Sequence, residues 1–229
     1  MDVLSQNEFE TLICGAKLLE KDRHGPKVYA TQDGKAVKLF RVKRWLSSNL
    51  FCRYAVRFKR NAEHLAILGI PSLQVEQVGV VPHLDRQLVI YPWLPGASLR
   101  HALRNSNPQE ALRLMRSMGT ALALIHEKGV YFRSMHFGNI LINNNDASIS
   151  LIDILDLSVM RKPLSIPRRK RNFQHMIRYE EDRVRLTEFW NPFKEAYGQW
   201  ATNANSHALP ILDCLLETWH RELVKKIYD

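Results

Sequence analysis

The segment Pro92-Trp93-Leu94-Pro95-Gly96 divides the 229-residue sequence into two parts with different hydrophobic patterning. Two prolines and a glycine within five residues interrupt any helix or strand that reaches them. Before this segment, apolar residues alternate or cluster over short stretches, as in strands, whereas after it they recur at helical spacing. We therefore predict a bilobal α+β fold, with one domain at residues 1–91, a hinge at 92–98 and a second domain at 99–229.

The first domain is expected to be a small, mainly antiparallel sheet with one main helix. The Asp33-Gly34 pair is typical of a tight hairpin turn. The main helix is expected to end near Leu68, because Gly69 and Pro71 follow it. A shorter helix is expected over residues 8–14. The expected strands cover residues 16–20, 27–31, 35–40, 72–81 and 87–91.

The second domain is expected to be mostly helical. Asn107-Pro108 predicts the start of a long helix that ends at Gly129, and Ser98 predicts the cap of a shorter one. Two strands, at 139–142 and 149–155, are expected to form a hairpin before a helical C-terminal part. There, an apolar stripe from Leu212 to Ile227 favours packing within the helical domain over binding to a membrane or a partner helix. 

The composition indicates a soluble globular chain. With 45% hydrophobic and 24% charged residues, the chain differs from disordered proteins, collagen and coiled coils. No apolar stretch is long enough to span a bilayer, and the N-terminus lacks the basic and apolar regions of a signal peptide. The separated cysteines Cys14, Cys52 and Cys214 suit a reducing compartment and have no zinc-binding spacing. We expect a cytoplasmic protein, with peripheral attachment to the inner face of the cytoplasmic membrane as the alternative.

The net charge of +10 includes two basic fields that contain no acidic residue. The first runs from Lys35 to Arg60 with nine basic residues, and the second runs from Arg161 to Arg178 with seven. Such fields indicate an anionic partner, which could be a nucleic acid, an anionic lipid, or a phosphorylated or carboxylated substrate. The alternative is a solvated surface whose charges only maintain solubility. Nucleic acid is the weakest candidate, because no zinc-binding, RNP-type or helix-turn-helix motif supports it.

Four residues have the types and order that a phosphoryl-transfer site needs. Lys38 ends a strand-like Ala-Val-Lys run, where a lysine can pair with nucleotide phosphates. Glu63 is a lone acidic residue in a cationic helix, which makes it a candidate ion-pair partner of Lys38. Asn139 and Asp153 lie on successive strands, and oxygen ligands from adjacent turns can hold Mg²⁺. The alternatives are an ordinary surface glutamate and a hairpin that carries an incidental Asn and Asp.

The surroundings of Asn139 resemble the catalytic loop of a known enzyme family. The run Gly129-Val130-Tyr131-Phe132-Arg133-Ser134-Met135-His136-Phe137-Gly138-Asn139-Ile140-Leu141-Ile142 is similar to the loop of the bacterial lipopolysaccharide core sugar kinases. This Kdo and heptose kinase family has a protein kinase-like fold, and its loop reads approximately Gly-Val-x-His-x-Asp-Leu-x-x-x-Asn-Ile-Leu. The resemblance covers residues 28–178 and includes the basic segment 167–178.

The resemblance implies roles for seven residues and two cofactors, ATP and Mg²⁺. Lys38 would bind the phosphates of ATP, and Glu63 would orient Lys38. Asn139 and Asp153 would hold Mg²⁺. The adenine-binding hinge would be formed by Pro92, Trp93 and Leu94.

The loop departs from the family pattern at the residue that takes the proton of the attacking hydroxyl. Five residues before Asn139, where the family has its catalytic aspartate, this sequence has Ser134, and Phe132 replaces the preceding histidine. A serine hydroxyl is not a base near neutral pH. His136 could take the proton, because an unperturbed imidazole has a pKa of about 6.5. Ser134 and His136 are therefore the candidate catalytic residues.

Two functions from different classes fit these residues. The first is an ATP-dependent phosphotransferase that acts on a lipopolysaccharide core sugar, with the basic fields holding an anionic sugar or glycolipid acceptor. The second is a pseudokinase that binds nucleotide or a partner in envelope biogenesis or its regulation. Lys38, Glu63, Asn139 and Asp153 favour metal and nucleotide binding in both, whereas Ser134 and Phe132 favour the pseudokinase.

Overall fold

The computed structural model describes residues 1–41, 54–143 and 148–199, with a few positions between 209 and 221. The chain divides into two compact units, Met1–Pro95 and Gly96–Asp229. Their boundary falls within the segment 92–98, whose role as a hinge stays a prediction. The part of the first basic field from 42 to 53 lies outside the described residues. So do all six residues that define the predicted C-terminal stripe, namely Leu212, Leu215, Leu216, Trp219, Leu223 and Ile227.

The N-terminal unit contains a six-stranded sheet of order β1-β5-β6-β4-β3-β2. All neighbouring strands are antiparallel except β1 and β5, which confirms the mainly antiparallel sheet. The strand predicted over 72–81 begins only at Gln77, because continuing its register would place residue 75 opposite Pro92, which has no N–H to donate. The strands are β1 (Asp2–Val3), β2 (Lys17–Asp22), β3 (Gly25–Ala30), β4 (Lys35–Arg41), β5 (Gln77–Val81) and β6 (Arg86–Pro92).

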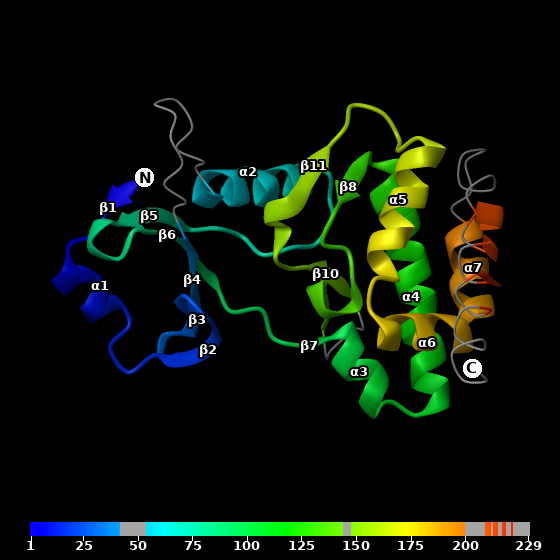
Figure 1. The fold of residues 1–229 in the computed structure, drawn as a ribbon, viewed down its shortest axis with the longest axis horizontal. Coiled ribbons are helices and arrows are strands. Elements are labelled where there is room, and N and C mark those ends of the chain that lie inside the picture. Colours follow the sequence, from blue (N-terminus) through cyan, green and yellow to red (C-terminus); the bar gives the residue numbers. More distant parts are fainter. Residues whose placement is uncertain are drawn as a thin grey trace. The chain divides into compact units, whose positions relative to one another are not determined.

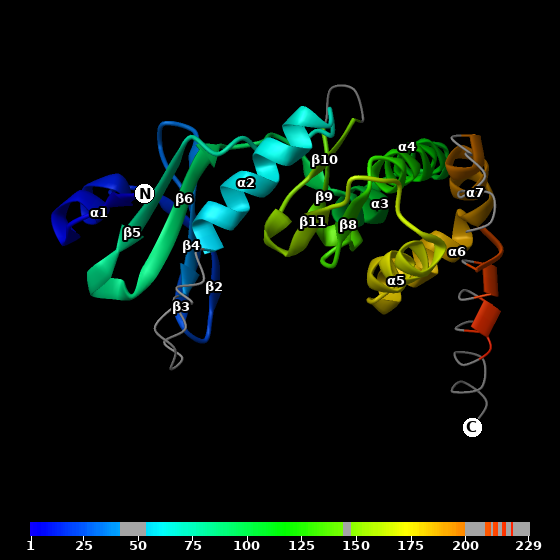
Figure 2. The same ribbon diagram turned by 90° about the horizontal axis from the view of Figure 1, so that it is seen from above.

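Side chains alternate between the two faces of β4, and each face packs against a different helix. Val37 and Leu39 lie in a buried cluster with Phe9 of α1 (Gln6–Leu12). Phe40 faces the other way, with its ring centroid 5.4 Å from that of Phe58 on α2 (Tyr54–Ile67). Figure 2 shows the two helices on opposite sides of these strands.

The C-terminal unit is mostly helical, as predicted. Asn107 caps the long helix by accepting the N–H of Glu110 at 2.9 Å, and α4 packs along α7 (Figure 1). The Ser98 hydroxyl caps α3 by accepting the N–H of His101 at 3.2 Å. The helices are α3 (Leu99–Asn105), α4 (Pro108–Glu127), α5 (Ile166–Met176), α6 (Glu180–Glu188) and α7 (Trp190–Gln199). None of the helices in the described residues is long and apolar enough to cross a bilayer.

Two small sheets interrupt the helices, one of order β10-β9-β7 and one that pairs β11 with β8. The predicted hairpin is present as β9 and β10, but its second strand ends at Leu151 and not at 155. Asp153 has φ 52° and ψ 45°, a left-handed conformation that a strand does not continue through. The strands are β7 (Ala97–Ser98), β8 (Val130–Phe132), β9 (Ile140–Ile142), β10 (Ile149–Leu151) and β11 (Leu157–Val159).

A chain of buried hydrogen bonds joins α4, α5 and α7. The Asn172 amide donates to the Phe132 carbonyl at 2.6 Å, so its Oδ1 accepts from Nε2 of His126 at 3.0 Å. Nδ1 of His126 then accepts from the Tyr197 hydroxyl at 2.8 Å, and that oxygen accepts from Arg169 at 3.2 Å. His126 is therefore held as the neutral tautomer protonated at Nε2.

Burial lowers the pKa of His126 to about 3, and the Arg169 guanidinium adds to this effect. The unfolded chain takes up a proton at this residue below pH 6.5 or so, whereas the folded chain does not. We expect the free energy of unfolding to fall between about pH 6.5 and 3, by up to about 1.4 kcal/mol per pH unit. Denaturant unfolding at several pH values measures this slope.

The matched pair of variants for this experiment is His126→Gln and His101→Gln. His126→Gln should make the free energy of unfolding depend less steeply on pH, because a glutamine side chain does not titrate. The second removes an exposed imidazole and should leave the slope unchanged. If the free energy of unfolding had the same slope with pH in the wild type and in His126→Gln, a buried, neutral His126 would be contradicted.

Candidate functional site

The predicted catalytic loop connects β8 to β9 and ends in a short 3-10 turn at Phe137–Asn139. The Asn139 side chain donates from Nδ2 to the main-chain oxygen of Ser134 at 3.0 Å. The Asn139 carbonyl accepts the N–H of Ile152 at 3.0 Å. These two hydrogen bonds fix the shape of the loop and place Asn139 beside the residue that precedes Asp153.

Asp153 holds a strained backbone conformation. Among the described residues other than glycine, only Asp85 and Asp153 have a positive φ. This conformation costs an L-residue about 1–2 kcal/mol, although Asp and Asn tolerate it better than most. Strain of this kind is concentrated at functional sites, where the surrounding structure enforces it.

Asn139 and Asp153 carry the amide and carboxylate oxygens that can act as ligands of a magnesium ion. Because Nδ2 of Asn139 is engaged by Ser134, its Oδ1 is the atom left for a metal. No cluster of three His, Cys, Asp or Glu side chains suited to a metal occurs among the described residues. Mg²⁺ needs no such cage, since it is usually held by one or two carboxylates together with substrate phosphates and water.

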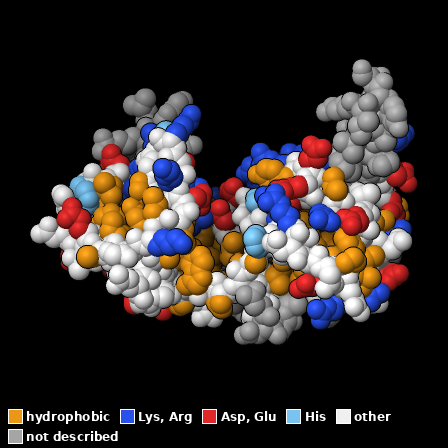
Figure 3. Space-filling view, turned by 90° about the horizontal axis from the view of Figure 1, so that it is seen from below, with side chains coloured by type: hydrophobic (Ala, Val, Ile, Leu, Met, Phe, Trp, Pro, Cys, Tyr) orange, Lys and Arg blue, Asp and Glu red, His pale blue; other side chains and the backbone are white. Residues whose placement is uncertain are grey.

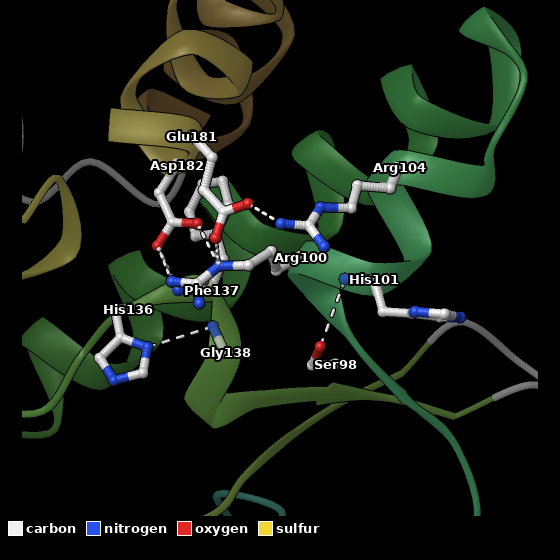
Figure 4. A network of polar contacts seen from close by, with 9 residues as sticks. All are labelled: Ser98, Arg100, His101, Arg104, His136, Phe137, Gly138, Glu181 and Asp182. Atoms are coloured by element: carbon white, nitrogen blue, oxygen red, sulfur yellow. Dashed lines mark hydrogen bonds and ion pairs between the residues drawn. The ribbon is translucent and has the colours of Figure 1, made fainter. Parts of the chain in front are cut away.

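His136 is oriented by its own loop. Its Nδ1 accepts the N–H of Gly138 at 3.2 Å (Figure 4). The ring lies edge-on to Tyr179, with centroids 5.0 Å apart. Burial lowers the pKa of His136, and the nearby Arg100 guanidinium lowers it further. The imidazole is therefore neutral at pH 7, and because Nδ1 accepts, Nε2 carries the proton. In this arrangement neither nitrogen has a free lone pair for an attacking hydroxyl.

The residues that hold this loop were not predicted from the sequence. Arg100 donates to both carboxylate oxygens of Asp182, from Nε at 2.8 Å and from an Nη at 2.9 Å (Figure 4). Asp182 is only 1% exposed and also accepts the N–H of Phe137 at 3.1 Å. It therefore joins α6, α3 and the catalytic loop. The sequence carries no signal for this role, because acidic residues at 180–182 are ordinary in the first turn of a helix.

The structure does not bring Glu63 to Lys38. Lys38 is buried in β4, with Nζ 5.9 Å from the centroid of the Phe58 ring. Within the described residues the ion pair of Glu63 is with Lys59, at 3.9 Å, and its side chain is 57% exposed. The phase of α2 explains this difference, since Phe58 faces the sheet and Glu63 lies on the solvent side. The buried polar side chain of this helix is Asn61.

The predicted hinge residues offer few backbone groups to a nucleotide. Pro92 has no N–H, and the N–H of Trp93 donates to the Gly34 carbonyl at 2.8 Å. Trp93 is about half exposed, at 48%. Of the three residues, Leu94 is the one whose N–H makes no backbone hydrogen bond within the described residues.

The two basic fields are less uniform than the sequence indicates. In the first, Lys35 pairs with Glu76 at 3.0 Å, whereas Lys38 is buried. In the second, Arg169 is fully buried and pairs with Glu127 at 2.7 Å, so the prediction that it belongs to a surface field is wrong. A helix with 3.6 residues per turn cannot keep consecutive side chains on one face. Figure 3 shows Lys and Arg interspersed with Asp and Glu on the face that it draws.

Comparison with solved structures identifies the fold. The structure titled "WaaP in complex with acyl carrier protein" matches with a TM-score of 0.55, covering 99% of each chain at 15% sequence identity. The chain has a kinase-like fold. This likeness confirms the predicted fold class, with an antiparallel sheet followed by a helical part. No protein-family model and no curated protein matches the sequence. Because 1432 chains of solved structures match, the fold alone does not assign an activity.

Proposed function

We propose that this protein binds ATP with Mg²⁺ and is a lipopolysaccharide-kinase-like phosphotransferase whose catalytic step is impaired. The proposal rests on the hydrogen bonds of Asn139. Its side chain donates to the main-chain oxygen of Ser134, and its carbonyl accepts the N–H of Ile152, which precedes Asp153. In a kinase-like fold, these oxygen ligands and a buried strand lysine are the groups that phosphoryl transfer uses. The likeness to WaaP and the resemblance of the loop to core sugar kinases support the same class.

Each retained residue has a role in this proposal. Lys38 binds phosphate oxygens, and Asn139 and Asp153 hold the metal ion. When bound, Mg²⁺ would neutralise charge on the phosphoryl group that is transferred. Leu94 offers its N–H to the adenine. Among the described residues, Glu63 pairs with Lys59, which does not support an orienting role.

The impairment follows from the two candidate catalytic residues. Ser134 has no carboxylate, and the Nδ1 of His136 is occupied by the N–H of Gly138. Phosphoryl transfer depends mostly on positioning and charge neutralisation, so loss of a base slows the reaction without abolishing it. The second candidate function is a pseudokinase in envelope biogenesis, which Ser134 favours. The two functions differ in whether ADP is released.

An anionic sugar or glycolipid acceptor fits a group of exposed cations on the C-terminal unit. Burial lowers the pKa of His175, and so do Arg171, Arg133 and Arg178, which places three cations around this imidazole. Arg178 also lowers the pKa of His136, so it lies near the catalytic loop. Arg171 and Arg178 of the second field, together with Arg133 from the loop after β8, replace Arg169 as the proposed acceptor-binding residues.

The metal pair is tested by Asp153→Asn. Asparagine adopts the left-handed conformation as readily as aspartate, so the fold should be kept while the charged ligand is lost. We expect magnesium-dependent ATP binding, measured by isothermal titration, to weaken at least tenfold, which corresponds to about 1.4 kcal/mol. The melting temperature should change little.

The matched control is Asp156→Asn, which removes a carboxylate from the same short segment without removing the proposed ligand. It should bind Mg·ATP like the wild type. Equal binding by wild type and Asp153→Asn, or equal weakening by both variants, would contradict the metal site.

A further inference from the structure

Three arginines surround His24 in the turn between β2 and β3 of the N-terminal unit. Arg23 Nε donates to His24 Nε2 at 3.1 Å, and an Nη of Arg41 lies 3.0 Å from the same nitrogen. An Nη of Arg86 donates to the His24 carbonyl at 2.7 Å. The end of β4, the start of β6 and the tip of the β2–β3 hairpin thus bring three guanidinium groups to one residue.

In the part of the chain that the structure describes, no ion pair neutralises the positive charge of this cluster. Arg41 and Arg86 lie directly opposite each other in the sheet, where like charges are destabilising. Within the described residues, none of the three guanidinium groups pairs with a carboxylate. The Asp22 carboxylate accepts the N–H of His24 at 2.7 Å instead. Residues 42–53, which follow in the sequence, contain three further basic residues and no acidic one.

The arginine with the most contacts is already held in place. Arg86 is half-buried, and its guanidinium also donates to the carbonyls of Leu84 at 3.2 Å and Asp85 at 3.4 Å. A side chain that is ordered before binding loses less conformational entropy when a ligand arrives. The planar guanidinium matches the oxygen spacing of phosphate better than an ammonium does.

The cluster lies on the face of the sheet that is opposite to Lys38. Alternation along β4 puts Arg41 on the same face as Val37 and Leu39, which pack against α1. Lys38 points to the other face, toward Phe58 of α2. Figure 2 shows α1 and α2 on opposite sides of these strands. The cluster is therefore separate from the place where the proposed function puts the phosphates of ATP.

We propose that the three arginines around His24 form a binding site for an anionic phosphate group. Such a group would relieve the repulsion between Arg41 and Arg86 and would accept hydrogen bonds that no carboxylate of the described residues now accepts. The phosphate could be borne by a lipid headgroup or by a small molecule, and the chemistry of recognition is the same for both.

The test measures binding by the full chain without ATP or Mg²⁺, so that its outcome is independent of the proposed function. The probes are inorganic phosphate, vesicles of phosphatidylglycerol with phosphatidylcholine, and vesicles of phosphatidylcholine alone. We expect Arg41→Gln to lower phosphate affinity about tenfold, the effect of losing one charge-assisted hydrogen bond. Arg41→Lys should lose less, because it keeps the charge. The control Lys17→Gln removes an exposed cation at the other end of β2 and should change affinity less than about twofold.

The outcomes separate the sources of the phosphate. If Arg41→Gln loses binding to both anionic vesicles and inorganic phosphate, the result supports a lipid headgroup. If it loses binding to inorganic phosphate alone, the result supports a small molecule. If Arg41→Gln lowers the melting temperature, Arg23→Gln tests the same site from the turn, where the side chain is exposed. The proposal is overturned if the wild type binds neither phosphate nor anionic vesicles, or if Lys17→Gln weakens binding as much as the arginine variants do.

Discussion

Replacing Ser134 with aspartate is expected to raise phosphoryl transfer by about 10²–10⁴-fold, the usual contribution of a general base. The position is suited to this change because Asn139 donates to the main-chain oxygen of Ser134, at 3.0 Å, and not to its side chain. The loop should therefore keep its shape while it gains a carboxylate. The measurement is ADP release with core oligosaccharide as the acceptor, in the presence of Mg²⁺.

Ser134→Asn is the matched control, because it has nearly the same size as the aspartate variant and no basic oxygen. It should leave the rate at the wild-type level. His136→Ala should also change the rate little, since Nδ1 of His136 accepts the N–H of Gly138 and Nε2 carries the proton. A wild-type enzyme that His136→Ala inactivates and Ser134→Asp leaves unchanged would refute the proposed impairment. If Ser134→Asp binds Mg·ATP but does not release ADP, the pseudokinase is the better description.

Asp182→Asn is expected to lower the free energy of unfolding by about 3 kcal/mol. This value is the lower end of the usual loss of stability when one partner of a buried ion pair is removed. The Asp182 carboxylate accepts from Arg100 at 2.8 and 2.9 Å and from the Phe137 N–H at 3.1 Å. An amide cannot accept all three hydrogen bonds, because one of its two terminal atoms is a donor. Arg100, whose side chain is 23% exposed, would keep some access to water, which limits the loss. Denaturant unfolding measures this difference.

Glu181→Gln is the control on the same helix. Its carboxylate pairs with Arg100 at 2.8 Å and with Arg104, but the side chain is 38% exposed. Exposed pairs contribute about 0–1 kcal/mol, so this variant should be close to the wild type in stability. Because Asp182 positions the catalytic loop, Asp182→Asn should also weaken Mg·ATP binding under conditions where the protein stays folded. Similar stabilities for the two variants would contradict the role assigned to Asp182.

Local patterns in the sequence predicted the elements of this fold well. Asn107 and Ser98 cap helices where their side-chain chemistry indicated, and the strand that carries Lys38 runs from Lys35 to Arg41. The hairpin after Asn139 is also present, with Leu151 at its end. These features depend on neighbouring residues, whose capping, turn and periodicity preferences act within a few positions.

Side-chain environments were predicted less well, and the errors share a cause. Glu63 was expected to pair with Lys38, but the rotation of α2 places its carboxylate on the exposed side, next to Lys59. Arg169 was counted in a surface field, although it is buried beside Tyr197. A composition count assigns a charge to a stretch of sequence and gives no information about which way each side chain points.

The sequence by itself determined the kinase-like order of strands and helices. It also determined the residue types of the candidate site, Lys38, Asn139 and Asp153. Both depend on local patterns and short spacings along the chain. Only the tertiary structure decided what those residues can do. The partners of His136, Asp182 and Arg86 come from segments far apart in the sequence, and the proton on an imidazole or the anchoring of a loop depends on these partners. Burial and hydrogen bonding set such properties, and both arise only when distant segments pack together.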